Sequence, residues 1–287
     1  MRRVALLLLV VTTACGGTNI ATTTSPSGAS STTLESTTTT TAAPLPVGCP
    51  QDSEFITAGR IGRITQPTFD SRVLGLISIQ SSDGCERLGF DFETAENAPA
   101  TTPPSVSAEF VQDGRIIRIR MPLETTVITD QLIETPLVER LYVVRGLDGM
   151  MFIDVHLTAA AAARISVTNS PAAMTLELAS RNSEIGPAPA VSETTVLLEP
   201  SNGAEPPGTG LVISGYSRAF EATVLIVATK DNQVVVNEFT TAADWVETWG
   251  EFEATIDLPP GETDLFVGDQ SPRDGSLEGV TIKLTAR

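Results

Sequence analysis

Beyond about residue 48, apolar and polar side chains alternate with a period of two over short segments of the chain. In residues 115–121, for example, Ile117 and Ile119 alternate with Arg118. Alternation of this kind is typical of a β-strand with one buried face. The pattern predicts strands at residues 115–121, 151–157, 174–178, 196–198, 211–214, 222–229, 234–239, 252–258, 264–267 and 280–284.

Turn signals separate these segments. Asp113-Gly114 and Asp148-Gly149 are typical of tight hairpin turns. The alanine run at residues 159–163 predicts a single helical turn, and the sequence contains no long amphipathic helix. We therefore predict an all-β fold.

The folded part divides into two regions. Residues 183–191, which include Pro187 and Pro189, read as a linker between domains. About 240 residues suit two modest domains, so we predict two β-sandwich-like domains in tandem, at residues 48–182 and 192–287. In the second, short strands with turn signals about every ten residues favour an immunoglobulin-like sandwich.

The beginning of the chain has the layout of an export signal. Two arginines precede a short apolar run at residues 4–11, and small residues follow it. The run is too short to span a bilayer, which needs roughly 20 apolar residues. We predict that residues 1–14 direct export and are then removed.

Cys15 resembles the lipid-modified cysteine in the lipobox of bacterial lipoproteins. Ala14 fits that pattern, whereas Thr12 departs from it. The resemblance implies acyl chains such as palmitate on Cys15, and a protein anchored in the cell membrane on its extracytoplasmic face. Stable anchoring needs more than one acyl chain, which the diacylglyceryl group of such lipoproteins supplies. The alternative is an ordinary secreted protein.

Residues 15–47 contain the predicted lipid site and then a tether. Thr, Ser, Ala and Pro dominate this segment, and Glu35 is its only charged residue. With almost no large apolar side chains the segment cannot offset its ordering entropy, so we predict a disordered tether with ends roughly 30 Å apart. The composition is typical of O-glycosylated stalks and of unmodified linkers alike.

Two cysteines remain besides Cys15. In an oxidising compartment Cys49 and Cys85 are expected to form a disulfide. The alternative is two free thiols. Two cysteines and one histidine, widely spaced, do not match the ligand spacing of a zinc site.

The charge of the chain restricts its partners. Without Arg2 and Arg3, 16 of the 18 basic residues remain against 35 acidic ones, a formal charge of −19. A surface of this kind repels nucleic acid and disfavours peripheral binding to anionic lipid. We expect no nucleic-acid partner.

The first region resembles the AMIN-like domains of actinobacterial lipoproteins. The stretch at residues 84–92 is similar to their opening strand, with Glu86 and Arg87 in its acidic-basic position. Residues 138–157 resemble the central hairpin, and residues 163–178 the closing strands. The resemblance covers roughly residues 55–180 and implies a β-sandwich associated with cell-wall targeting.

The second region resembles the immunoglobulin-like domain of bacterial spore-germination proteins over about residues 192–286. The block at residues 213–222, which contains Phe220 and Glu221, carries the likeness together with residues 249–252 and 269–276. It implies an extracellular β-sandwich with an interaction role and no enzymatic activity. It does not imply a spore.

Few residues stand out as candidate sites, and we assign no catalytic, metal-binding or cofactor-binding residue. His156, the only histidine, is predicted at the surface, because a catalytic role would require a nucleophile beside it. Asp269 and Asp274 have carboxylate oxygens of the kind that bind calcium. Their spacing does not match a known calcium loop. A turn capped by Asp is the commoner explanation for such residues. Trp245 and Trp249 either stack on a sugar or, more commonly, fill the core.

These features together suggest a non-catalytic cell-envelope lipoprotein. We expect its modules to bind a cell-wall polymer such as peptidoglycan, or another envelope protein. The alternatives are an accessory subunit of a membrane-bound envelope enzyme or transporter, and a hydrolase of unrecognised type.

Overall fold

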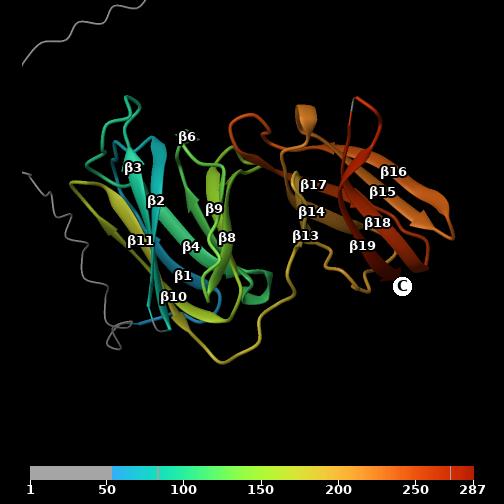
Figure 1. Cartoon of the computed structure of the whole chain (residues 1–287), viewed down its shortest axis with the longest axis horizontal. Helices are drawn as coiled ribbons and strands as arrows, with labels where there is room; N and C mark the ends of the chain where they lie inside the picture. Colours follow the sequence, from blue (N-terminus) through green and yellow to red (C-terminus); the bar gives the residue numbers. More distant parts are fainter. Residues whose placement is uncertain (1–53, 83, 272) are drawn as a thin grey trace, which may run out of the picture. The chain divides into compact units, whose positions relative to one another are not determined.

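The computed structural model describes residues 54–82, 84–271 and 273–287, and this part of the chain is all-β (Figure 1). Cys15, Cys49, the predicted signal and the predicted tether lie outside the described residues. No helix in the described part is long and apolar enough to cross a membrane.

The first sandwich packs two sheets around one core. Its strands are β1 (Arg60–Ile64), β2 (Val73–Ser82), β3 (Cys85–Glu93), β4 (Val106–Val111), β5 (Ile116–Met121), β6 (Thr125–Thr126), β7 (Asp130–Leu132), β8 (Val138–Arg145), β9 (Met151–Leu157), β10 (Ala161–Thr168) and β11 (Ala173–Ser180), with a 3₁₀ turn η1 (Gln112–Gly114). One sheet has the order β10-β11-β3-β2-β6, and the other contains β1-β4-β5-β9-β8, with β7 beside β8. Phe90 and Leu176 from the first sheet meet Ile119 and Ile153 from the second in the core.

The second sandwich is smaller and has its own core. Its strands are β12 (Ala190–Val191), β13 (Thr195–Glu199), β14 (Leu211–Ser217), β15 (Thr223–Lys230), β16 (Gln233–Thr241), β17 (Trp249–Ile256), β18 (Gly261–Gln270) and β19 (Leu277–Ala286), with a 3₁₀ turn η2 (Phe220–Ala222). One sheet has the order β17-β14-β13-β12, and the other β16-β15-β18-β19. Ile213 and Phe252 pack against Ile226 and Ile282 between them.

The period-two pattern located these strands well. Each predicted segment falls on a strand, and residues 151–157 coincide with β9. Gly114 and Gly149 have positive φ values, as hairpin turns require. The helical turn predicted at residues 159–163 is wrong. Most of that run belongs to β10, because its alanines pair with the end of β11, and this long-range pairing overrides helix propensity.

A short parallel pairing joins the two sandwiches. In β17, Trp249 and Gly250 lie opposite Val144 and Arg145 of β8, so one sheet of each sandwich belongs to a single continuous sheet. The segment between the sandwiches also touches the first of them, since Arg115 donates to the Gly186 carbonyl at 2.9 Å. The predicted domain boundaries stay predictions.

Candidate functional site

The strand β9 is buried on both faces, although the alternating pattern predicts only one buried face. Ile153 and Val155 point into the core of the first sandwich. Phe152, on the opposite face, packs against the second sandwich. The buried apolar residues of this contact, called the junction here, are Ile116, Tyr142, Val144 and Phe152 of the first sandwich and Val196, Leu198, Tyr216 and Trp249 of the second.

Aromatic rings form the centre of the junction. The ring of Tyr142 lies 5.1 Å from that of Tyr216 and 5.0 Å from that of Trp249, both in tilted or edge-on geometry. Such arrangements are favourable beyond the area they bury. The indole nitrogen of Trp249 donates to Asp130 at 3.2 Å, so the polar atom of the ring is satisfied as well.

A buried ion pair lies beside these rings. Arg118 donates to both carboxylate oxygens of Asp154, at 2.9 and 2.7 Å, and lies 3.6 Å from Glu251 of the second sandwich. Its guanidinium stacks on Phe152 at 4.2 Å from the ring centre. Desolvation opposes the charge of Arg118, yet Asp154 and Glu251 outweigh it and raise its pKa. Arg118 therefore keeps its charge while buried.

The prediction of a surface histidine is wrong. His156 is only 3% exposed, and its Nε2 forms a hydrogen bond with the Tyr216 hydroxyl. Desolvation, with the charges of Arg115, Arg118 and Arg140, lowers its pKa to about 3. The physical reason is that the second sandwich covers the face that the strand pattern assigned to solvent.

The neutral state of His156 gives a pH-dependent prediction. The pKa returns to about 6.5 on unfolding, so between about 3 and 6.5 the unfolded chain binds the extra proton, and acidification destabilises the fold. The titration of His156 should lower the free energy of unfolding by about 2 kcal/mol at pH 5 relative to pH 7. His156→Gln removes this titration. From pH 7 to pH 5 the variant should therefore lose about 2 kcal/mol less of its free energy of unfolding than the wild type, as measured by urea denaturation. An unchanged pH dependence would contradict a buried, neutral histidine.

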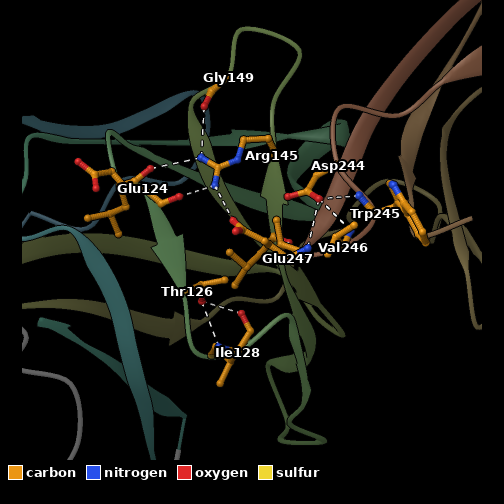
Figure 2. A network of polar contacts seen from close by, with 12 residues as sticks. Glu124, Thr126, Ile128, Arg145, Gly149, Asp244, Trp245, Val246 and Glu247 are labelled. Carbon is orange, nitrogen blue, oxygen red and sulfur yellow. Dashed lines mark hydrogen bonds and ion pairs between the residues drawn. The ribbon is translucent and has the colours of Figure 1, made fainter. Parts of the chain in front are cut away.

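A loop of the second sandwich forms another anchor to the first (Figure 2). Asp244 accepts hydrogen bonds from three successive backbone amides, ending at Glu247, and so holds the loop that precedes β17. Thr248 donates to the Val143 carbonyl of β8. Arg145, at the end of β8, binds the Glu124 carbonyl at 2.6 Å and lies 3.9 Å from the Glu247 carboxylate. The loop is thereby fixed on the first sandwich.

The second sandwich covers only part of the outer face of the sheet that contains β5 and β9. Beyond Phe152, the sheet presents a groove of about 380 Å³ that is lined by Arg60, Arg63 and Arg120 among others. The junction and this groove share one face of the same sheet, because Arg120 of β5 lies directly opposite Phe152 of β9.

The remaining predicted residues have structural surroundings. Trp249 fills the junction, whereas Trp245 is half-buried and packs edge-on against Phe220 at 5.4 Å. Asp269 accepts from the Phe220 amide, and Asp274 accepts from Ser276 in a turn. Within the described residues, no group of three or more candidate metal ligands occurs.

Cys85 begins β3 and is buried. Its predicted partner Cys49 lies outside the described residues, so the disulfide stays a prediction. The next two residues, on which the AMIN-like resemblance depends, are both engaged. Glu86 accepts from the Leu137 amide at 2.9 Å, and Arg87 donates to Glu177. Both thus hold the first sandwich together.

Sequence reasoning missed Arg118, Asp154 and Tyr216 as members of one cluster. A signal was present in β9, where Phe152 shares a face with Asp154 and His156. A large aromatic residue on an otherwise polar face is a sign that something covers that face.

Two packed sandwiches, with no helix longer than a 3₁₀ turn in the described part of the chain, define an all-β protein whose second half has immunoglobulin-like architecture. Residues 195–276 match the family described as the immunoglobulin-like domain of bacterial spore germination. This confirms the resemblance predicted for the second region. No curated protein matches the chain. The AMIN-like resemblance of the first region stays a prediction.

Proposed function

We propose that the protein is a non-catalytic binding protein of the cell envelope that is anchored by lipid on Cys15 and binds cell-wall polymer. The observation that carries the proposal is the junction. The ionisable residues beside it, Arg118, Asp154 and His156, are buried and bonded to partners, which suits a role in holding two modules together. The match of the second sandwich to an immunoglobulin-like domain also supports a binding or structural role.

The junction gives such a protein a physical advantage. Binding surfaces that are fixed relative to each other lose less conformational freedom when a long ligand spans both of them. A flexible link between the modules would raise that entropic cost. The contact of Arg118 with Glu251 and the hydrogen bond between His156 and Tyr216 cross between the sandwiches and restrict this motion.

Co-sedimentation with purified cell wall tests the proposal. The mature protein carrying Cys15→Ser, which removes the lipid site, should sediment with cell walls. Binding should persist after proteins are stripped from the walls, because the ligand is the polymer. Absence of binding at every salt concentration would contradict the wall-binding function.

A protein partner is the second candidate, and strand β16 favours it. This strand lies at the edge of its sheet, and its side chains Val234 and Phe239 are each 62% exposed. Exposed apolar residues on an unpaired edge strand are typical of a surface that another protein covers. Sedimentation that is lost when the walls are stripped of protein would support this candidate instead.

A further inference from the structure

The groove beside the junction collects positive charge on an acidic protein. Arg63 of β1 lies opposite Ser107 of β4, which in turn lies opposite Arg120 of β5. Directly opposed residues on neighbouring strands point to the same face of a sheet. Arg60 lines the same groove, and Glu109 is the one acidic residue of its lining.

None of these three arginines forms an ion pair among the described residues, although Arg60 lies opposite Glu109 of β4. Other arginines of the same sandwich, such as Arg87 and Arg118, form ion pairs at 2.5 and 2.7 Å. The chain has 35 acidic residues against 18 basic ones, so unpaired arginines do not reflect a shortage of carboxylates. Three guanidiniums left unpaired in one groove are free to bind an anion from outside.

One arginine of the groove, Arg120, is held in place by a ring. Arg120 lies over the ring of Phe152, 5.2 Å from the ring centre, and Phe152 is itself held by the junction. Stacking of this kind orients a guanidinium while leaving its N–H groups available for a ligand.

The spacing of the arginines indicates the size of the ligand. Arg63 and Arg120 lie two strands apart, which separates their backbones by about 10 Å. Arg60 and Arg63 are three positions apart along β1, again about 10 Å. At this spacing the three guanidiniums can contact successive anionic groups of one extended chain.

We propose that this groove binds an anionic polysaccharide, a wall polymer whose repeating unit carries phosphate or carboxylate groups. The inference rests on the proposed function, which places the protein against the cell wall, and adds the chemical class of the ligand and its site. Arginine suits both groups, because its planar fork donates two parallel hydrogen bonds to either one.

A binding experiment on the mature chain with Cys15→Ser tests the inference, by calorimetry with four probes. The probes are poly(glycerol phosphate), polygalacturonate, neutral dextran and poly-glutamate. The groove variant carries Arg60→Gln, Arg63→Gln and Arg120→Gln. The control variant changes the net charge equally, through Arg72→Gln, Arg181→Gln and Arg273→Gln, none of which lines the groove. Thermal unfolding verifies that both variants fold.

The wild-type protein should bind poly(glycerol phosphate) or polygalacturonate, the two anionic wall-type polymers, and should not bind dextran. Hydrogen bonds to charged groups contribute enough that the groove variant should bind at least about tenfold more weakly, whereas the control should keep its affinity. Equal weakening in both variants, or no binding to either polysaccharide, would overturn the inference. Poly-glutamate bound as tightly as the polysaccharides would assign the groove to an acidic protein instead.

The outcomes also separate this inference from the proposed function. If the groove variant still sediments with cell wall as the wild type does, the wall-binding function stands and the groove is not its site. If the wild type itself fails to sediment, the proposed function fails whatever the groove binds.

Discussion

Replacing Arg118 with methionine should lower the free energy of unfolding by about 3–5 kcal/mol, because the change leaves a buried charge without its partner. The side chain of Asp154 is fully buried, and both of its oxygens accept hydrogen bonds from Arg118. Methionine keeps much of the apolar bulk against Phe152 but supplies neither charge nor donor. Urea denaturation followed by circular dichroism measures the loss.

A double variant separates the lost charge pair from lost packing. Arg118→Met combined with Asp154→Leu removes both charges and replaces them with apolar side chains of similar size. Replacing a whole buried ion pair in this way is often neutral or stabilising. We therefore expect the double variant to be more stable than Arg118→Met alone. If it is equally unstable or worse, the damage comes from packing and not from an unpaired Asp154.

The Arg118–Asp154 pair illustrates what the sequence could and could not predict. The alternation in β5 and β9 correctly separated two faces of each strand, with Ile119 and Ile153 facing the core. It assigned Arg118 and Asp154 to the other face, which is also correct. Alternation distinguishes the two faces of a strand but does not say what covers the second face, and here the second sandwich covers it.

The second sandwich packs on this face through contacts between residues that lie far apart in the sequence, and such contacts leave no local sequence pattern. His156 and Tyr216 are 60 residues apart, and the parallel pairing of β8 with β17 involves only two residue pairs. Such contacts become visible only after both sandwiches have folded and docked. In contrast, the second sandwich was identifiable from residues such as Phe220 and Glu221, because its likeness lies in contiguous blocks of sequence.

Replacing Trp249 with alanine should destabilise the protein by about 3–5 kcal/mol, since truncation of a large buried ring leaves a cavity. Trp249 is 2% exposed, and its ring contacts Tyr142 and Tyr216 from opposite sides of the junction. The indole also donates to Asp130, which would lose that partner. Because the contacts of Trp249 with Tyr142 and Asp130 join the two sandwiches, the change should also weaken the coupling between them.

Trp245→Ala is the matched control, since these are the two tryptophans of the chain and Trp245 is half-buried beside Phe220. We expect it to cost about 1 kcal/mol, in the range of one exposed aromatic contact. Each variant keeps one tryptophan as a fluorescent probe. In Trp245→Ala the remaining probe, Trp249, reports on the junction, so urea transitions by fluorescence and circular dichroism should coincide.

In Trp249→Ala the remaining probe, Trp245, packs against Phe220 and reports on the second sandwich. If the junction couples the two sandwiches, its loss lets them unfold at different urea concentrations, and the fluorescence and circular dichroism transitions should separate. Coincidence of transitions measured by different probes is the test of a single cooperative unit. Transitions that still coincide in Trp249→Ala would mean that the remaining contacts, such as the Arg118–Glu251 pair and the loop held by Asp244, are sufficient to keep the sandwiches unfolding as one.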